Sequence, residues 1–298
     1  MEERESAKEE VYNMNWDKGF IQSLKEVAYP PELYHYNKIS KSIEGGFGNV
    51  TDTDLQFFHD HGYLVVHDAF DQSDIELAQQ SIYDLIDGKY PDFKGVQIEP
   101  KLHKYLAELS GLEKRKATRK IHGFVDCDSH LNSMFYNQDL LQVLARLMDD
   151  EPLYLQDMAL LKPSDFGSEK PWHQDCAYFN YPLGTTVIGV WIALDQATSE
   201  NGCMHIAPGS HKEPMIHFKR RDWQICDTDV SGENDTLVPL EPGGCLFFHG
   251  LIHHGTPVNF SRSQRRALQF HYRPACADTI TTEARLEIFG SEGANAEC

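Results

Sequence analysis

The chain has 298 residues, 41% of them hydrophobic and 24% charged, which provides enough apolar surface for a sizeable folded core. Its 27 basic and 46 acidic residues give a formal net charge of -19, and a surface this acidic disfavours binding to nucleic acid or to an anionic membrane because it repels polyanions. The seven cysteines form no CxxC pair, the first residues contain no apolar signal region, and no apolar run approaches the ~20 residues of a membrane-spanning helix. We therefore expect a cytoplasmic protein.

The chain changes in character near its middle. Residues 1–50 are expected to form an N-terminal extension, followed by one domain over 51–290. The first part of that domain, about 51–150, has helical periodicity, whereas the part over about 151–280 is rich in short β-prone runs. Helices gathered before strands favour a mainly β member of the α+β class over an alternating βαβ fold.

Apolar residues recur at helical spacing in three segments, which we expect to be helices: 53–62, 73–86 and 137–148. Thr53 is a candidate N-cap of the first helix and Gly62 its candidate C-cap, while Asn137 is the expected cap of the third. Strands are predicted at 63–66, 153–162, 186–195, 203–207, 236–240, 244–249 and 266–273.

Two of these predicted strands have a polar face opposite an apolar one. In 265–273 the polar face carries Arg265, Ala267, Gln269, His271 and Arg273; in 154–162 the corresponding face carries Tyr154, Gln156, Met158, Leu160 and Lys162. Polar inner faces suit a barrel with a wet cavity whose outside is covered by helices. The alternative is an ordinary half-exposed strand with its polar face in water.

The segment 171–175, with sequence PWHQD, is the most informative for chemistry. Positions i and i+2 of an extended strand point to the same side, so His173 and Asp175 can bind one ion together. A second histidine from farther along the chain would complete a 2-His-1-carboxylate face, which is typical of non-haem Fe(II) oxygenases. The alternative for each single histidine is a surface or hydrogen-bonded core residue.

Several motifs in fixed order accompany this segment. They are FFHDHGYLVV at 57–66, QDM at 156–158, HQD at 173–175, GVWIAL at 189–194, ENGC at 200–203, PGSH at 208–211, and HGT at 254–256 followed by Arg265. Over about 53–280, this layout closely resembles the phytanoyl-CoA dioxygenase family of Fe(II)- and 2-oxoglutarate-dependent oxygenases. The resemblance implies a double-stranded β-helix, a jelly-roll or cupin-like barrel, with the N-terminal helices packed outside.

The resemblance also assigns roles to individual residues. It implies that His173, Asp175 and His254 bind the iron, with His253 and His249 as competitors of His254 for the distal position. The family arginine follows the distal ligand by eleven residues, at Arg265, and its guanidinium would bind the distal carboxylate of 2-oxoglutarate through paired hydrogen bonds. Arg266 is the alternative, but it falls on the opposite face of the predicted strand.

Further co-substrate contacts implied by the resemblance are Thr256, Trp191, Met158 and Lys120. Without the resemblance, Met158 and Trp191 would be interpreted as barrel packing, and Lys120 as part of a solvated basic cluster. Candidates for contacts to the primary substrate are Gln156, Tyr178, Phe179, Gln269, His271, Arg220, Arg221 and Trp223. The last three lie in the segment 212–235, which we expect to cover the mouth of the barrel.

The implied activity is oxidation of an unactivated C–H bond with Fe(II), 2-oxoglutarate and O2, releasing succinate and CO2, with ascorbate as a candidate reductant. Because Asp175 occupies the position where related halogenases have a small residue, hydroxylation is expected, with desaturation or oxidative ring closure as variants. We expect a small-molecule substrate, of amino-acid or natural-product type, and leave the oligomeric state open. The alternatives are an acyl-CoA hydroxylase, a non-catalytic metal- and 2-oxoglutarate-binding sensor, and a metallohydrolase.

Overall fold

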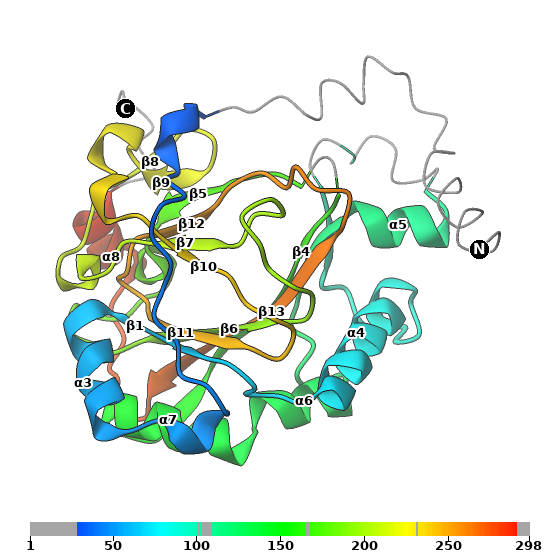
Figure 1. Cartoon of the computed structure of the whole chain (residues 1–298), viewed down its shortest axis with the longest axis horizontal. Coiled ribbons are helices and arrows are strands. Elements are labelled where there is room, and N and C mark those ends of the chain that lie inside the picture. Colours follow the sequence, from blue (N-terminus) through cyan, green and yellow to red (C-terminus); the bar gives the residue numbers. More distant parts are fainter. Residues whose placement is uncertain (1–28, 100–101, 103–108, 165–166, 231, 291–298) are drawn as a thin grey trace.

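The computed structural model describes residues 29–99, 102, 109–164, 167–230 and 232–290 (Figure 1). Their strands form two antiparallel sheets that pack face to face and a separate two-stranded ribbon. In spatial order, the large sheet contains β1 (Tyr63–Val66), β11 (Cys245–His249), β6 (Ile188–Ala193), β13 (Arg265–Pro274), β4 (Pro152–Lys162), β3 (Thr118–His122) and β2 (Val96–Ile98). The small sheet contains β10 (Thr236–Val238), β7 (Met204–Ile206), β12 (His254–Thr256) and β5 (Lys170–His173), and the ribbon pairs β8 (His217–Lys219) with β9 (Trp223–Ile225).

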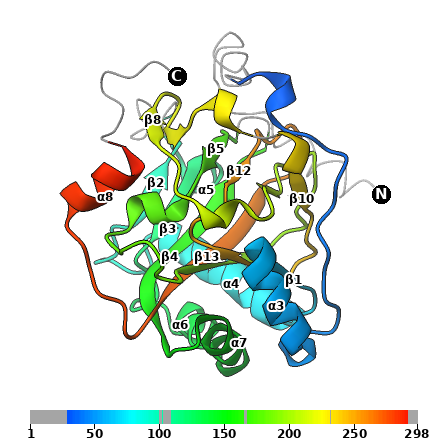
Figure 2. The ribbon, with the colours of Figure 1, turned by 90° about the vertical axis from the view of Figure 1, so that its left-hand side faces the viewer.

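Helices cover the outer face of the large sheet, as Figures 1 and 2 show. They are α3 (Asp52–His61), α4 (Gln72–Ile86), α6 (Ser129–Phe135) and α7 (Gln138–Met148), whereas α5 (Gly111–Ala117) and α8 (Thr282–Phe289) lie beyond the sheet. Short 3-10 turns are η2 (Pro31–Leu33), η3 (Phe47–Asn49), η5 (Asp175–Tyr178), η6 (Ser210–Lys212), η7 (Asp227–Asp229) and η8 (Gly232–Asn234). The predicted mainly β jelly roll with helices outside is confirmed, as two open sheets rather than a closed barrel. Among the residues described, no helix is both long and apolar enough to cross a membrane.

Local sequence signals account for the helix ends. Thr51 caps α3 with its hydroxyl and its backbone N–H, both of which donate to the Asp54 carboxylate, so the N-cap lies two residues before the predicted one. Gly62 ends it in the left-handed conformation, with φ 81°, as the sequence predicted. The side chain of Asn137 accepts a hydrogen bond from the backbone N–H of Leu140 and caps α7, also as predicted.

The two faces of β13 enter different environments. Leu268, Phe270 and Tyr272 are buried in the core between the large sheet and the helices. Ala267 packs into the core between the sheets, and Gln269 and His271 lie buried on the same inner face. The predicted alternation therefore holds along β13, and it directs polar side chains into the interior of the jelly roll.

An irregularity in the pairing of β4 with β13 changes this alternation at one end. Gln156 is opposite His271, but the next pair is Tyr154 with Tyr272, so Leu155 is extra in β4. The ring of Tyr154 consequently packs against Phe135 of α6. The prediction of Tyr154 on the inner face is therefore wrong, because the bulge shifts the phase of the strand by one residue.

The segment before α3 packs against both sheets. Tyr34 stacks on Trp172 of β5 with the ring centroids 5.7 Å apart, and the backbone N–H of Ile43 donates to the carbonyl of Val65 at 2.9 Å. Residues 29–50, the described part of the expected 1–50 extension, therefore pack on the outside of the jelly roll. The domain boundary near residue 50 stays a prediction.

Candidate active site

Three predicted metal ligands converge because of strand pairing. His173 is the last residue of β5 and His254 the first of β12, and these two residues are direct partners across the antiparallel pair. Such partners have side chains on the same face, and here the ring centroids are 4.2 Å apart. Asp175 follows two residues later, in the turn η5 and not in an extended strand as the sequence analysis assumed. Its Oδ1 lies 3.2 Å from Nε2 of His173 and 3.7 Å from Nε2 of His254.

The donor set fits a divalent first-row metal ion. All three side chains are buried, and one potential ligand atom from each lies within 4.8 Å of the others. Nδ1 of His173 lies 2.8 Å from the carbonyl oxygen of Pro171, and Nδ1 of His254 lies 3.0 Å from that of Ile252. Because a carbonyl oxygen only accepts hydrogen bonds, both Nδ1 atoms carry the proton and the Nε2 lone pairs face Asp175.

The charges of the triad also suit metal binding. Burial lowers the pKa of His254 to about 3, so its imidazole stays neutral near physiological pH. Burial on its own would raise the pKa of the Asp175 carboxyl, but the neighbouring His254 and His271 hold it well below its ordinary value. Two neutral imidazoles and one carboxylate are the donors of a non-haem iron site.

The glutamine between the two ligands fixes their position. Nε2 of Gln174 donates to the carbonyls of Glu213 and Leu251, at 2.8 and 2.6 Å, and its Oε1 accepts from the backbone N–H of Met215 at 2.7 Å. The backbone N–H of Gln174 donates to Nε2 of His217 at 3.1 Å. The middle residue of the HQD motif therefore ties β5 to two neighbouring loops.

Two predicted substrate residues lie against the carboxylate ligand. Oδ2 of Asp175 is 2.7 Å from Nε2 of His271 and 3.3 Å from Nε2 of Gln269. Gln269 also lines the cavity that is described below. His271 is not part of the described lining of that cavity, and its ring packs against Phe179 and Phe248. The geometry thus gives both side chains a contact to the carboxylate of the candidate metal site.

Arg265 is a buried cation with unused hydrogen-bond donors. It is 2% exposed, its Nη2 donates to the carbonyl of Gly202 at 3.0 Å, and its Nε and Nη1 have no partner among the residues described. The guanidinium lies 5.1 Å from the ring centroid of Trp191. Burial lowers the pKa of Arg265 to about 10, yet the group stays charged near neutral pH. A buried guanidinium with free donors fits a carboxylate ligand, such as the distal carboxylate of 2-oxoglutarate.

Lys162 is a further buried cation that the sequence analysis did not assign to the site. Lys162 lies directly opposite Arg265 in the antiparallel pairing of β4 with β13. Its Nζ donates to Oγ1 of Thr256 at 2.8 Å and to the carbonyl of Ser168 at 2.9 Å. Burial and the nearby charge of Arg265 hold the pKa of Lys162 well below its ordinary value. Its place on the polar face predicted for 154–162 was the sequence signal that could have identified it.

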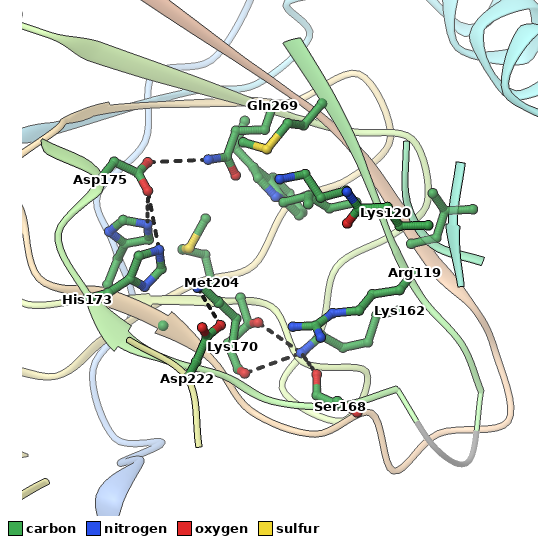
Figure 3. A pocket seen from close by; sticks show the side chains of 18 of the residues that line it. Arg119, Lys120, Lys162, Ser168, Lys170, His173, Asp175, Met204, Asp222 and Gln269 are labelled. Atoms are coloured by element: carbon green, nitrogen blue, oxygen red, sulfur yellow. Dashed lines mark hydrogen bonds and ion pairs between the residues drawn. The ribbon is translucent and has the colours of Figure 1, made fainter. Parts of the chain in front are cut away.

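A cavity of about 680 Å³ joins the triad to these cations. Among the residues proposed from the sequence, it is lined by Lys120, Gln156, Met158, His173, Asp175, Tyr178, Phe179, Trp191, His254, Thr256, Arg265 and Gln269. Arg119, Lys170, Met204 and Asp222 also line it, although the sequence analysis did not assign them to the site (Figure 3).

The remaining predicted substrate residues lie outside the cavity lining. Arg221 pairs with Glu169 at 2.7 Å and with Asp227 at 2.6 Å, and Arg220 lies 3.4 Å from Asp227. Trp223 packs edge-on against Tyr178 with the ring centroids 5.1 Å apart. Carboxylates of this chain therefore already neutralise the two arginines of the 212–235 segment.

The neighbouring histidines and arginine do not belong to the triad. Nδ1 of His249 accepts from the backbone N–H of Leu251 at 3.0 Å, and the backbone N–H of His253 donates to Oγ of Ser210 at 2.8 Å. Arg266 pairs with Asp195 at 2.6 Å. In the triad detected among the described residues, the distal histidine is His254.

Comparison with known proteins agrees with this site. Residues 58–267 match the family model for phytanoyl-CoA dioxygenase. A probable phytanoyl-CoA dioxygenase of Caenorhabditis elegans is 26% identical over 232 residues, covering 73% of each chain, and the peroxisomal phytanoyl-CoA dioxygenase of Bos taurus is 25% identical over 240 residues, covering 76% of this chain and 70% of its own.

Solved structures share the fold at lower identity. EctD from S. alaskensis, crystallised with 2-oxoglutarate and 5-hydroxyectoine, is 18% identical with a TM-score of 0.62, covering 84% of this chain and 82% of its own. The carbocyclase SnoK from nogalamycin biosynthesis is 17% identical with a TM-score of 0.60, covering 80% and 90%. The chain belongs to the phytanoyl-CoA dioxygenase family of Fe(II)- and 2-oxoglutarate-dependent oxygenases.

Proposed function

We propose that this oxygenase hydroxylates a C–H bond of a small molecule, with His173, Asp175 and His254 as the iron ligands and Arg265 as the anchor of 2-oxoglutarate. The observation that carries the proposal is the buried guanidinium of Arg265, whose Nε and Nη1 have no partner among the described residues and which lines the same cavity as the triad. Leaving such a cation without an anion costs several kcal/mol, so its place in the fold favours a site completed by a carboxylate ligand.

Iron and 2-oxoglutarate, when bound, supply an oxidant for C–H cleavage, with succinate and CO2 as co-products. The protein contributes the orientation of the reactants within the cavity. Trp191 packs beside the Arg265 guanidinium, and Lys162 holds the hydroxyl of Thr256, so the donors proposed for the distal carboxylate are fixed before the co-substrate binds. Met158 and Lys120 line the same cavity and are proposed as further co-substrate contacts.

The substrate pocket proposed here uses the remaining side chains of the cavity wall, including Gln156, Tyr178 and Phe179. The hydroxyl of Tyr178 donates to the carbonyl of Trp223 at 2.8 Å and accepts from Nζ of Lys170 at 3.1 Å, which gives the pocket a fixed polar edge. A small-molecule substrate is supported by the epimerase SnoN, a structure of the same fold that was crystallised with Fe3+, α-ketoglutarate and nogalamycin RO.

Succinate release under air tests the proposal. Purified protein supplied with Fe(II), 2-oxoglutarate and ascorbate should convert 2-oxoglutarate to succinate, and the rate should rise when a true substrate from a metabolite panel is added. Asp175→Ala is the matched inactive control. A sensor would bind both ligands with no succinate formed, and a metallohydrolase would act without 2-oxoglutarate, so either result would contradict the proposal.

The cytoplasm is the proposed location. Exposed free thiols at Cys127 and Cys276 support a reducing compartment, whereas the disulfide of Cys226 does not. Relatives named as peroxisomal act in a different compartment, and imaging of a tagged full-length chain separates the two locations.

A further inference from the structure

An ion pair forms the part of the cavity wall to which the 212–235 segment contributes. Nζ of Lys170, on β5, lies 2.7 Å from Oδ2 of Asp222, and both residues line the cavity. Figure 3 shows the two side chains pointing toward one another. About a third of each side chain is exposed, 32% of Lys170 and 34% of Asp222. We call these two residues the cavity ion pair.

Tyr178 connects the cavity ion pair to the candidate metal site. Its hydroxyl accepts a hydrogen bond from Nζ of Lys170 at 3.1 Å and donates to the carbonyl of Trp223 at 2.8 Å. The ring centroid of Tyr178 lies 6.0 Å from that of His173. A substrate held beside the metal ion would therefore lie next to this polar group.

A second ion pair, one residue away, already anchors the 212–235 segment beside β5. Arg221 pairs with Glu169 at 2.7 Å and with Asp227 at 2.6 Å. The hydroxyl of Tyr34 donates to Glu169 at 2.8 Å. None of these four residues belongs to the described lining of the cavity. The position of the segment therefore does not depend on the cavity ion pair alone, and a partly exposed ion pair adds little stability by itself.

The cavity ion pair has unused hydrogen-bonding capacity. An ammonium group has three N–H donors, and Nζ of Lys170 uses two of them, on Asp222 and Tyr178. The Asp222 carboxylate can accept about four hydrogen bonds and accepts two, from Lys170 and from the backbone N–H of Trp223 at 2.8 Å. Among the residues that the structure describes, one ammonium proton and the remaining carboxylate lone pairs are thus available side by side.

Both members of the cavity ion pair are charged near neutral pH. Burial on its own would raise the pKa of Asp222, but the Lys170 ammonium lowers it to about 2. Burial on its own would lower the pKa of Lys170, but Tyr178 and Asp222 raise it above its ordinary value. The two charges cancel. A carboxylate placed there would face Asp222 and an ammonium would face Lys170, so repulsion disfavours either ion, whereas a neutral group that both donates and accepts matches the pair.

We propose that the cavity ion pair recognises a neutral hydroxyl or carboxamide group of the primary substrate. The Lys170 ammonium would donate to the oxygen of that group, and the Asp222 carboxylate would accept its O–H or N–H. The proposal rests on the function proposed above and adds the class of substrate to it. The 212–235 segment contributes a substrate contact, as the sequence analysis expected, but through Asp222 rather than through its arginines.

The binding test uses the full-length protein loaded with Zn(II), a redox-inactive substitute for Fe(II), and with saturating 2-oxoglutarate, so that the co-substrate site is filled. Ligand-observed NMR compares four probes with one carbon frame: cyclohexanol, cyclohexanecarboxamide, cyclohexanecarboxylate and cyclohexylammonium. The wild type should bind the alcohol or the amide more tightly than either ion, and the comparison of the two neutral probes distinguishes a hydroxyl from a carboxamide. Equal or tighter binding of an ion, or no binding of either neutral probe, would overturn the proposal.

Single substitutions should change the charge preference in opposite directions. Asp222→Asn leaves the ammonium without its carboxylate, so the affinity for cyclohexanecarboxylate relative to cyclohexanol should rise about tenfold or more. Lys170→Met leaves the carboxylate without its ammonium and should favour cyclohexylammonium by a similar factor. A pair with a purely structural role would not produce this reversal, so an unchanged preference in either variant would contradict the proposal.

Two further variants separate recognition from folding. Lys170→Met with Asp222→Leu leaves no unpaired charge, which keeps the test valid where a single variant does not fold, and should weaken cyclohexanol binding about tenfold. Glu169→Gln is the matched control, because it removes a carboxylate next to Lys170 but outside the described lining, and it should leave all four affinities unchanged. Unchanged cyclohexanol binding in the double variant, or an effect of Glu169→Gln as large as that of Asp222→Asn, would refute recognition by the pair.

Failure of the proposed function is detected separately. The same NMR experiment reports whether 2-oxoglutarate binds to the metal-loaded wild type, and absence of that binding would contradict the proposed function. The four probes can then be compared on the metal-free protein, where a preference for the neutral probes would still support recognition by the cavity ion pair and a preference for an ion would overturn it.

Discussion

Asp175 and His271 form a buried hydrogen bond that orients the carboxylate of the proposed metal site. Nε2 of His271 lies 2.7 Å from Oδ2 of Asp175, which leaves Oδ1 of that carboxylate turned toward His173 and His254. Partners that hold a metal ligand from behind restrict it to one orientation and strengthen metal binding. His271 is therefore a positioning residue in this account.

Substitution of His271 should weaken metal binding before it affects the fold. We expect His271→Ala to lower the affinity for Fe(II) about tenfold or more, because the Asp175 carboxylate loses its fixed orientation. His271→Gln, which keeps a donor near Oδ2, should restore part of that affinity. Calorimetric titration of the apo-proteins with Fe(II) under anaerobic conditions checks both variants, and equal affinities in wild type and His271→Ala would refute the positioning role.

Arg265 and Arg266 provide a comparison between the two faces of β13. Loss of the charge-assisted hydrogen bonds in Arg265→Ala should weaken 2-oxoglutarate binding by roughly 1.5–3 kcal/mol, with little change in metal affinity. Arg266→Ala should leave 2-oxoglutarate binding intact, because Arg266 pairs with Asp195 outside the cavity lining. Titration of 2-oxoglutarate into metal-loaded protein measures both. The reverse pattern would show that the co-substrate approaches the other face of the strand.

The distal ligand is testable against its two neighbours. Purified His254→Ala should lose bound iron and iron-dependent succinate formation, because two remaining ligands hold Fe(II) weakly. His253→Ala and His249→Ala should retain iron, since neither side chain belongs to the buried triad. Metal analysis of the three variants side by side decides the assignment, which would fail if His254→Ala kept its iron and another variant lost it.

Acid should destabilise the apo-protein partly through His217. Burial lowers the pKa of His217 to about 3 from the ordinary 6.5, and its neutral Nε2 accepts a hydrogen bond from the backbone N–H of Gln174. Between these pH values the unfolded chain binds more protons than the folded one, so stability falls as the pH falls. The loss from this residue approaches about 1.4 kcal/mol per pH unit. Urea titrations at several pH values from 7 to 4 give the free energy of unfolding at each pH. This free energy should fall less steeply with falling pH in His217→Gln than in the wild type, and an equal pH dependence in the two proteins would exclude this contribution.

The predictable parts of the fold are those with local signals. The helices at α3, α4 and α7 have apolar periodicity and recognisable caps, such as Asn137, and the longer strands have the expected alternation. The short strands β2, β8 and β9 were not among the predicted strands, because three residues carry too little periodicity. The β-bulge at Leu155 depends on pairing with a strand more than a hundred residues away, so no local pattern predicts it.

The candidate site likewise contains residues that the sequence predicts and residues that only the tertiary structure reveals. The HQD motif and Arg265 stand in recognisable sequence contexts, and the structure brings His173, Asp175 and His254 together. Lys162 contacts Thr256 across 94 residues, and such a contact depends on tertiary structure rather than on local pattern. The same holds for Arg119, whose position on the cavity wall follows from the pairing of β3 with β4.

The central claim is that one buried site holds a metal ion on the His-Asp-His triad and 2-oxoglutarate on both that ion and Arg265. Anaerobic addition of Fe(II) and 2-oxoglutarate to the full-length protein tests it most directly, by visible absorption spectroscopy. A metal-to-ligand charge-transfer band should develop in the wild type, require more 2-oxoglutarate in Arg265→Ala, and be missing in Asp175→Ala. Absence of the band in correctly folded, iron-loaded wild-type protein would contradict the account.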